Sequence, residues 1–443
     1  MDVATQLDPN TAPPTTECDV LVIGGGPAGS TVAALLAERG RDVVVVEKAQ
    51  HPRFHIGESL LPANLPLFDR LGIAEEVRRI GLYKPGAEFV SDFYGKSNLF
   101  FFANASHLVA THSYQVRRAA FDQLLFDNCR RRGARTVENT RVTDIALTGE
   151  RPAVTAVGSD GTTTTWRPRF VVDASGRDTV MANKLGLKTS NKRNNTAAIF
   201  GHFTGVPGRQ GAAAGVITVH LVEDGWFWMI PLPDGLMSVG LVGSPSLFKN
   251  RKEGIETLFW DSVRAAPSVA ERMASAELTA PLTTTGNYSY TTRSAQGDRF
   301  LMIGDALTFI DPIFSSGVMI AMTSGILGAD AIDLYLTDAV RGRQALRGFE
   351  RAIRRGVGQL SWMIYRINEP VMRHMLMHPS NKFRMRDGVI SMLAGEIFDS
   401  GLATRGPMML FKLAYYSLTV RRWLERLGSK RSFLEPDIAK PAA

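Results

Sequence analysis

Residues 18–48 read CDVLVIGGGPAGSTVAALLAERGRDVVVVEK, and this stretch decides the fold of the chain. Residues 18–23 form a short β-branched run, which is typical of a buried strand. Glycines follow at once, and the apolar residues after them recur at helical spacing as far as Gly40. A second β-branched run covers residues 42–48. Strand, glycine turn, helix and strand in this order predict the βαβ unit of a parallel sheet with a right-handed crossover.

The turn of this unit has the pattern of a dinucleotide site. Its glycines make G-x-G-x-x-G between the predicted strand and helix, and Glu47 ends the next strand. Such glycines let the backbone approach a pyrophosphate, the helix N-terminus stabilises phosphate charge, and the acidic residue can accept from a ribose hydroxyl. A glycine turn without a ligand is the alternative, and the strand and helix on either side disfavour it. The predicted nucleotide-contacting residues of this unit are Gly24, Gly26, Pro27, Ala28, Gly29, Glu47 and Lys48.

Outward from this unit the pattern changes twice. Alternating runs rich in Phe, Val and Thr around residues 88–110 and 197–242 predict a mixed or antiparallel sheet inserted into the nucleotide-binding fold. Helical periodicity dominates from about Pro312 onward, with predicted breaks at Pro370, Pro379 and Gly406–Pro407. We therefore expect an α/β protein with a Rossmann-like domain, an inserted mixed β-sheet domain on the substrate side and a helical C-terminal region.

The expected division of the chain follows these changes of pattern. The predicted parts are a flexible lead-in over 1–17, a discontinuous nucleotide-binding domain over 18–90, 111–190 and 290–340, a substrate-side sheet domain over 91–110 and 191–289, and a helical region over 341–443.

Composition limits the class of protein. The chain has 443 residues, of which 44% are hydrophobic and 21% charged, the balance of a globular protein of roughly two to four domains. Two cysteines, Cys18 and Cys129, cannot form a disulfide framework or a thiolate metal cage, so we expect a reducing cytoplasm. The sequence predicts no transmembrane helix, and the N-terminal residues lack the basic leader and apolar core of a secretory signal.

Two later segments identify the nucleotide. Residues 171–177 read VVDASGR and residues 299–312 read RFLMIGDALTFIDP. With the glycine turn they resemble the FAD-dependent monooxygenase superfamily of the p-hydroxybenzoate hydroxylase type. The resemblance implies FAD as cofactor, with Gly304 and Asp305 at the ribityl chain, Arg118 near the flavin and pyrophosphate, and Asp173 also at the cofactor.

A tryptophan pattern narrows the family further. Residues 225–231, GWFWMIP, match W-x-W-x-I-P, and the sequence here resembles the flavin-dependent halogenases. Alternating tryptophans alone would fit ordinary core packing of a strand equally well. Residues 51–62, HPRFHIGESLLP, resemble the flavin-contacting strap of halogenases of the phenol and pyrrole type. The strap residues that this implies as cofactor contacts are Arg53, Ile56, Gly57, Glu58 and Ser59.

The resemblance also implies a halide loop and a catalytic lysine. Residues 311–318, DPIFSSGV, resemble the loop that holds halide beside the flavin, which implies Ser316 and Gly317 as halide-binding residues and Pro312, Gly317 and Val318 as flavin contacts. Lys84 lies where the family carries its catalytic lysine, which receives hypohalous acid or forms a haloamine. An exposed loop lysine is the alternative. If Lys84 is desolvated, its pKa falls, which favours the neutral amine.

The expected substrate follows from one departure. Trp226, Trp228 and Phe314 are the implied walls of the substrate chamber, and Phe314 stands where tryptophan-type halogenases carry a glutamate. Without that carboxylate the ring must be activated by its own substituents, which favours a phenol or pyrrole. We thus expect an FADH2-dependent halogenase of specialised metabolism that uses O2 and chloride or bromide.

Partners and alternatives remain open at this point. No second G-x-G-x-x-G unit follows Gly29, which predicts a separate NADH-dependent flavin reductase. An FAD-dependent aromatic hydroxylase, a geranylgeranyl-reductase-like saturase, a protein-modifying flavoprotein and a flavin-binding protein without catalysis are the competing functions. His374 and His378 lack a third ligand, so we predict no metal site, and no nucleic-acid partner is predicted.

The positive charge gathers in the C-terminal quarter. Residues 341–443 hold 19 Lys and Arg against 8 Asp and Glu, whereas residues 1–340 hold 32 against 35. Arginines from 341 to 355 recur largely at helical spacing. Three hypotheses fit: a solvated surface, docking of an acidic carrier protein that bears the aromatic substrate, and contact of the amphipathic residues 408–423 with anionic lipid.

Overall fold

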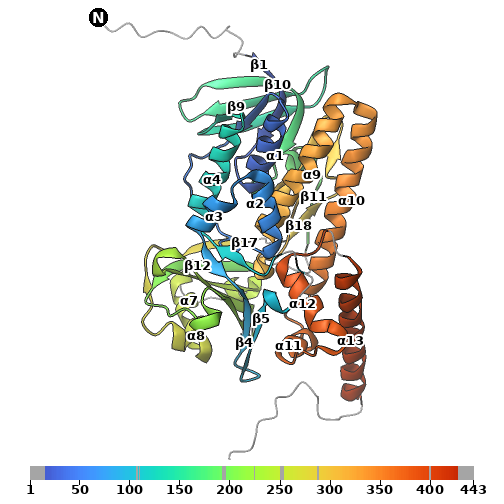
Figure 1. Ribbon diagram of the computed structural model, residues 1–443. Helices are drawn as coiled ribbons and strands as arrows, with labels where there is room; N and C mark the ends of the chain where they lie inside the picture. Colours follow the sequence, from blue (N-terminus) through green and yellow to red (C-terminus); the bar gives the residue numbers. More distant parts are fainter. Residues whose placement is uncertain are drawn as a thin grey trace, which may run out of the picture.

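The parallel sheet predicted from residues 18–48 forms the centre of the upper part of the molecule as drawn in Figure 1. In the computed structural model, residues 15–427 are described except 106, 107, 109, 192–195, 224, 250–253, 287, 288, 399 and 400. Strand β1 (Thr15–Ile23), helix α1 (Pro27–Glu38) and strand β2 (Val43–Val46) make the βαβ unit, with β1 and β2 parallel. Strand β1 therefore already includes the last three residues of the stretch 1–17 that was predicted as a flexible lead-in, and residues 1–14 of that stretch lie outside the described residues.

The first sheet has the strand order β19-β20-β10-β1-β2-β7, in which the five strands from β20 to β7 run parallel. Its further strands are β7 (Arg135–Val137), β8 (Thr140–Ala146), β9 (Ala153–Gly158), β10 (Thr163–Asp173), β19 (Gln296–Gly297) and β20 (Phe300–Met302). Helix α1 contacts both α4 (Arg118–Arg131) and α9 (Gly317–Thr337), and residues of these helices bury the β-branched strands of the sheet in one core. The predicted Rossmann-like domain is thereby confirmed.

A second sheet lies beside the first, with the order β16-β12-β15-β14-β13-β4-β5 and β17 paired to β12. Its strands are β4 (Gly86–Ser91), β5 (Lys96–Phe101), β12 (Ala197–Thr204), β13 (Ile217–Val222), β14 (Gly225–Pro231), β15 (Met237–Gly243), β16 (Glu277–Leu278) and β17 (Thr283–Gly286). One face packs on α7 (Ile255–Arg264) and α8 (Pro267–Arg272). The other face shares a core with the C-terminal helices.

One expected boundary falls inside a strand. All of β4 pairs with β5, and its residues 87–90 also pair with β13, so this sheet begins at Gly86. The nucleotide-binding domain was predicted to extend to residue 90. The alternation of apolar residues does not distinguish between two neighbouring sheets, and only the pairing partner places the strand.

Shorter elements join the two sheets. Strands β3 (Leu82–Lys84) and β6 (Ser113–Gln115) form a two-stranded ladder, and β11 (Lys188–Ser190), β18 (Tyr290–Thr292) and β21 (Thr308–Phe309) form a three-stranded one. Helices α2 (Leu65–Leu71), α3 (Ala74–Ile80), α5 (Val180–Lys184) and α6 (Pro245–Lys249) complete this part.

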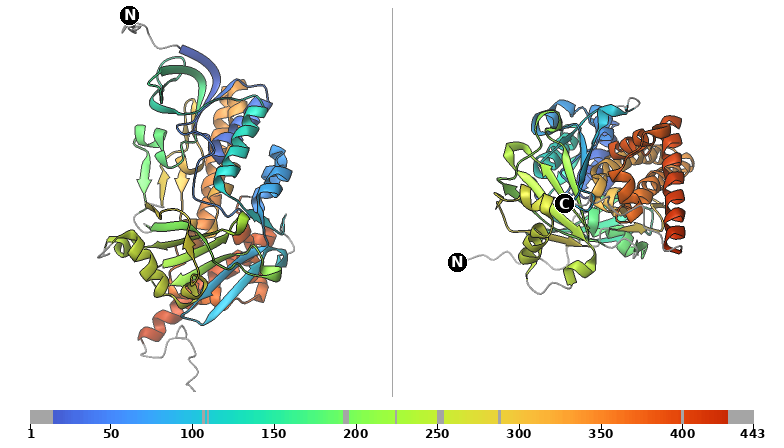
Figure 2. Two further views of the ribbon diagram at one scale, coloured as in Figure 1. Left: turned by 90° about the vertical axis from the view of Figure 1, so that its left-hand side faces the viewer. Right: turned by 90° about the horizontal axis from the view of Figure 1, so that it is seen from below.

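The C-terminal region is helical as predicted, with α10 (Ala339–Ile364), α11 (Pro370–Met377), α12 (Met385–Ala394) and α13 (Leu402–Leu427). Seen from below, these helices and the second sheet lie on opposite sides of the molecule (Figure 2). The break predicted at Gly406–Pro407 is wrong, because α13 continues through both residues. Pro407 lies in the second turn, where the missing N–H removes a single early hydrogen bond, and its ring is buried against the protein.

Helix α9 is long and apolar enough to cross a membrane by length and composition alone. Most of that window, 61%, is buried inside the protein, where α9 packs between α1 and α10. Among the described residues, α9 is therefore a core helix that joins the two halves of the fold.

Candidate active site

A cavity of about 390 Å³ opens where the carboxyl ends of the parallel strands meet the second sheet. The residues on it that the sequence assigned to the cofactor or chamber are Gly24, Gly26, Pro27, Ala28, Glu47, Lys48, Arg53, Ile56, Gly57, Glu58, Ser59, Arg118, Trp226, Trp228, Asp305, Pro312, Gly317 and Val318. The other residues that the sequence assigned to the site are not part of this lining and lie behind it: Lys84, Asp173, Gly29, Gly304, Phe314 and Ser316. The fold thus gathers residues from four distant segments around one space.

The glycines of the first turn are required by close backbone contacts. A Cβ on Gly29 would lie 1.9 Å from the Gly24 carbonyl oxygen, and Gly24 itself has φ +99°. The start of helix α1 therefore packs directly on the turn that follows β1. Pro27 lies in its first turn, no side chain caps its N-terminus, and this turn contains no acidic residue. Its free N–H groups and positive dipole end face the cavity, which suits a pyrophosphate.

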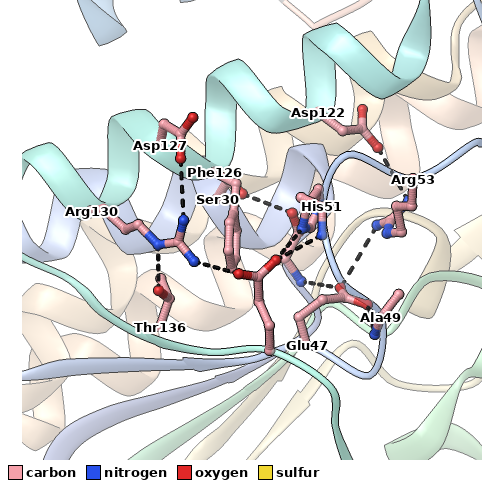
Figure 3. A network of polar contacts seen from close by, with 12 residues as sticks. Ser30, Glu47, Ala49, His51, Arg53, Asp122, Phe126, Asp127, Arg130 and Thr136 are labelled. Atoms are coloured by element: carbon pink, nitrogen blue, oxygen red, sulfur yellow. Dashed lines mark hydrogen bonds and ion pairs between the residues drawn. The ribbon is translucent and has the colours of Figure 1, made fainter.

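Glu47 also lines the cavity, and Figure 3 shows its polar contacts with neighbouring residues. The Glu47 carboxylate accepts from the backbone N–H of Gly25 at 2.7 Å and of Ala49 at 2.9 Å, and Arg53 lies 3.7 Å away. A carboxylate offers about four lone pairs, so acceptor capacity remains for a ribose hydroxyl. Figure 3 also shows Arg53 between Glu47 and Asp122.

Arg118 ties the strap to helix α4. Its guanidinium makes two hydrogen bonds to Asp122 and donates to the Ile56 carbonyl oxygen at 2.6 Å. Although Arg118 is buried, the Asp122 carboxylate beside it raises the pKa of Arg118, and the same contact lowers the pKa of Asp122. The charged side chain therefore holds residues 56 and 57 in place over the cavity.

Two predicted cofactor residues, Asp173 and Gly304, do not line the cavity and instead shape the backbone beside it. The Asp173 carboxylate accepts from the backbone N–H groups of Ser175 and Met181, and burial raises its pKa. Gly304 has φ +57° and packs against Ala28, which lets the next residue, Asp305, reach the cavity. Burial raises the pKa of Asp305 to about 6.

The tryptophan strand β14 forms one wall. Strand alternation places Trp226, Trp228 and Ile230 on the cavity side and Phe227 and Met229 on the opposite face, against α7 and α8. The two indole rings lie 5.9 Å apart, and the Trp228 N–H donates to Ser238 Oγ at 3.2 Å. This bond holds one indole in a single orientation.

The loop before α9 places the N-terminus of that helix at the cavity. Asp311 accepts from the Ile313 N–H at 3.2 Å and from Thr196 Oγ1 at 2.8 Å, and Ser315 adopts φ +56°. Gly317 and Val318 then open a 21-residue helix on the cavity, again without a side-chain cap. Ser316 is 1% exposed, and its Oγ has no hydrogen-bond partner among the described residues.

Phe314, predicted as a chamber wall, packs one layer behind the cavity. Its ring meets Phe89 of β4 edge-on at 6.5 Å. Phe314 thus adds bulk to the loop 311–318 and offers no hydrogen-bond acceptor there.

Lys84 is a buried amine at the end of β3. It is 1% exposed, and its Nζ donates to Ser59 Oγ and to the Leu60 carbonyl oxygen, each at 2.8 Å. Burial alone lowers its pKa to about 7. At this pKa the neutral amine makes up about half of the population at pH 7. In that form the two acceptors satisfy both N–H bonds, and the lone pair is free. The exposed-lysine alternative is excluded.

Ser59 connects Lys84 to the cavity. It lines the cavity and pairs with Gln115 of β6 in an isolated β-bridge. The strap and the β3–β6 ladder therefore place one hydroxyl between the amine and the open space.

Sequence reasoning missed one partner of the strap. His202 of β12 lies 2.9 and 3.0 Å from the two Glu58 oxygens. Nothing in the sequence signals this contact, because 144 residues separate the pair and only the packing of β12 against the strap brings them together.

Comparison with known proteins identifies the family of this site. A model of the FAD-binding domain matches residues 17–336. The chain is 35% identical over 338 residues to the tryptophan 2-halogenase of Chondromyces crocatus and 34% identical over 339 residues to the flavin-dependent halogenase armH3 of Armillaria mellea, covering 75% and 71% of this chain. The chain belongs to the flavin-dependent halogenases. It spans 64% of the length of the first of these halogenases and 67% of the second.

Other relatives match nearly the whole chain. A 1H-pyrrole-2-carbonyl-[peptidyl-carrier protein] chlorinase of Pseudomonas fluorescens is 27% identical over 96% of this chain and 98% of its own. Among solved structures, a flavoprotein/dehydrogenase of Cytophaga hutchinsonii gives a TM-score of 0.82 at 28% identity over 94% and 100% of the two chains. The flavin-dependent brominase Bmp2 gives 0.80 at 26% identity over 91% and 100%. The C-terminal helices are thus shared with other members of this halogenase fold.

The cavity fits the FAD that this family binds. Uncapped α1 and two arginines meet the charge of a pyrophosphate, Glu47 and Asp305 offer acceptors at separate points, and apolar groups of the strap and β14 form the remaining walls. These complementary groups lie in one continuous lining, as an elongated dinucleotide requires.

Proposed function

We propose that this chain halogenates an electron-rich aromatic ring with FADH2, O2 and chloride or bromide. The observation that carries the proposal is the buried Lys84 amine, which has a pKa lowered to about 7 and is hydrogen-bonded to Ser59 on the wall of the cavity. When bound and reduced, FAD supplies the activation of O2 that oxidises halide to hypohalous acid. The chain then has to hold that reagent and direct it to one ring position.

The halide end of the cavity is assigned to the start of α9. An uncapped helix N-terminus stabilises an anion, and Gly317 leaves open space where a side chain would stand. The unpartnered Ser316 Oγ lies directly before it. Ser316 and Gly317 are accordingly the proposed halide-binding residues.

The acceptor of the oxidised halogen is assigned to Lys84. Its free lone pair can receive hypohalous acid through a hydrogen bond or attack the halogen and release water, which leaves an N–halogen bond. Either way the halogen is fixed in space before the ring meets it. Trp226 and Trp228 separate the ring from the flavin and so prevent direct oxygen transfer.

The substrate class follows from the groups around the halide loop. Phe314 provides no carboxylate to take the ring proton, so a ring already activated by a hydroxyl or a pyrrole nitrogen is favoured. A similar chain acts as a chlorinase on a pyrrole bound to a peptidyl carrier protein. We propose a phenol or pyrrole for this chain, free or attached to such a carrier.

The partners are a flavin reductase and, with a tethered substrate, an acidic carrier protein. On α10, Arg347, Arg351 and Arg355 are exposed at a spacing of four residues and form a basic row. Both cysteines are buried and form no disulfide, which supports the proposed reducing cytoplasm.

The test supplies FAD, NADH and a flavin reductase to the purified protein with a panel of phenols and pyrroles in chloride or bromide. We expect a product mass that depends on the halide and disappears without the reductase. The similarity to a flavoprotein/dehydrogenase supports a second candidate, an oxidoreductase without halogen transfer. Oxidised or hydroxylated product that forms equally well without halide would establish that alternative.

A further inference from the structure

Helix α13 has two apolar faces, and the part of the chain that the structure describes covers only one of them. Thr404, Pro407, Met408, Phe411 and Tyr415 are buried against α11, α12 and the second core. Nine of the 16 exposed large hydrophobic side chains among the described residues lie on the rest of this one helix. Figure 1 shows α13 along the outer edge of the helical region, with no other element beyond it.

The exposed face has the spacing of a coiled-coil seam. Leu402, Met409, Tyr416 and Trp423 recur every seven residues, and Leu413, Val420 and Leu427 recur every seven residues four positions later. Alternating steps of four and three residues make one narrow apolar stripe, the pattern by which two helices pair. Over 26 residues the stripe is about 39 Å long.

We propose that a second copy of this chain covers this face, through antiparallel pairing of α13 with α13 about a twofold axis. Antiparallel pairing places Leu402 on the partner's Leu427, Met409 on the partner's Val420 and Leu413 on the partner's Tyr416. The stripe continues at Gly406, which then faces the partner's Trp423, so the smallest residue meets the largest. The face is therefore complementary to itself, as a twofold interface requires.

The area is sufficient for a stable dimer. Two helices that pair over about seven turns bury on the order of 1,200 Å² in total, the lower end of the range for specific interfaces. Trp423, 60% exposed in the single chain, contributes a large aromatic side chain to this area.

The charges beside the stripe give the pairing a distinctive salt dependence. In the antiparallel arrangement Arg405 lies beside the partner's Arg426 at both ends, and Glu425 is the only acidic residue on the helix. These like charges repel and salt screens them, so salt strengthens the dimer. Binding of the same basic helix to an anionic membrane would instead weaken with salt.

The experiment measures the mass of the full-length protein by sedimentation over a range of concentrations, at about 0.05 M and about 0.5 M salt. We expect a monomer–dimer equilibrium whose Kd falls at the higher salt and a blue shift of Trp423 fluorescence on dimerisation. Leu413→Glu, at the centre of the stripe, should raise Kd at least about tenfold, because it buries a charge against Tyr416. Val340→Glu, an exposed apolar residue at the start of α10, is the matched control and should leave Kd unchanged.

A charge reversal tests the direction of pairing. Arg405→Glu turns both repulsive contacts into ion pairs in the antiparallel dimer and should lower Kd about threefold at low salt. In a parallel dimer Arg405 faces neutral residues and the gain is absent. The proposal is overturned by a monomer at every concentration, by a dimer that survives Leu413→Glu, by an Arg405→Glu variant without tighter pairing, or by salt-sensitive binding of the monomer to anionic vesicles.

Discussion

In the proposed function, the Lys84 amine and the Ser59 hydroxyl carry the chemistry that distinguishes this site from an ordinary flavin pocket. Burial lowers the pKa of Lys84 to about 7, because the fold removes the amine from water and supplies no carboxylate partner among its described contacts. Ser59 belongs to the strap, so the same segment that lines the cavity also orients the amine. The residue-scale predictions therefore separate loss of the amine, its protonation and its orientation.

Replacement of the amine should uncouple halide oxidation from halogen transfer. Lys84→Ala is expected to reduce product at least about 100-fold while FAD remains bound, because Lys84 lies behind the cavity lining. Hypohalous acid should still be released, and a thiol or phenol-red trap in the medium measures it. Wild-type regiochemistry at more than a few per cent of the wild-type rate would show that another group transfers the halogen.

The pH dependence of the free energy of unfolding should reveal the lowered pKa of Lys84 independently of activity. In the native protein the pKa of Lys84 is about 7, against an ordinary value of 10.5, so between these pH values the unfolded chain binds a proton that the native chain does not. Stability therefore gains up to about 1.4 kcal/mol per pH unit as pH rises through this window. Urea unfolding of wild type and Lys84→Met at pH 7 and 9 isolates this gain. Equal changes in both proteins would mean that Lys84 is charged when folded.

Ser59 should act as a positioning residue for Lys84. Ser59→Ala removes one of the two acceptors of the amine and is expected to lower kcat about 10-fold with little change in KM. The acid limb of the pH–rate profile should shift as well, because the amine loses a partner. Ser59→Thr keeps the hydroxyl and should restore both the rate and the limb. A Thr variant as impaired as the Ala variant would indicate that only side-chain size matters there.

At the scale of elements, two helix N-termini and one strand face build the cavity. Helices α1 and α9 both begin there without side-chain caps, α1 at the predicted pyrophosphate site and α9 at the proposed halide site. Strand β14 turns its tryptophans inward because alternation and the two flanking cores leave no other orientation. Placement of these elements depends on close backbone contacts at glycine.

The contact of α1 with β1 should be essential for FAD binding. Gly29→Ala places a methyl group 1.9 Å from the Gly24 carbonyl oxygen and must push the helix away from the turn. We expect FAD affinity to fall at least about 30-fold, measured by quenching of flavin fluorescence, with a lower Tm. Gly208→Ala, where nothing lies within 4 Å of the added carbon, is the control. Unchanged affinity in Gly29→Ala would show that the turn is not the pyrophosphate site.

Across the whole molecule the positive charge is concentrated in the helical region after residue 340, whereas residues 1–340 hold slightly more acidic than basic residues. The excess of basic residues after position 340 appears in the structure as exposed arginines on α10 and a basic flank on α13. Such a surface accelerates encounter with an acidic partner and loses its effect in salt.

A carrier-bound substrate should depend on the α10 row. Arg347→Glu, Arg351→Glu and Arg355→Glu together are expected to lower kcat/KM for a tethered pyrrole at least about 10-fold and to leave the free acid unaffected. These three residues are preferred to Arg354, which already contacts Glu350 and the Thr292 carbonyl oxygen. An unchanged tethered rate, or equal activity on the free acid, would remove carrier docking from the function.

The local sequence by itself determined the βαβ unit, the FAD-binding class, the tryptophan strand and the helical C-terminus. These features depend on periodicity and on residue types that act within one segment: glycines at a turn, alternation in a strand and apolar spacing in a helix. The match of Lys84 and of the strap to the family motifs can also be read from short stretches of sequence.

Only the tertiary structure decided how these segments meet. It assigned β4 to the second sheet, continued α13 through Pro407, brought His202 to Glu58 and placed Ser59 between Lys84 and the cavity. It also showed that one face of α13 stays exposed, which a helical pattern alone cannot reveal because both faces are apolar. Burial and pairing depend on residues far apart in the chain, so the pKa of Lys84 and the layout of the site emerge only when the sheets and helices pack.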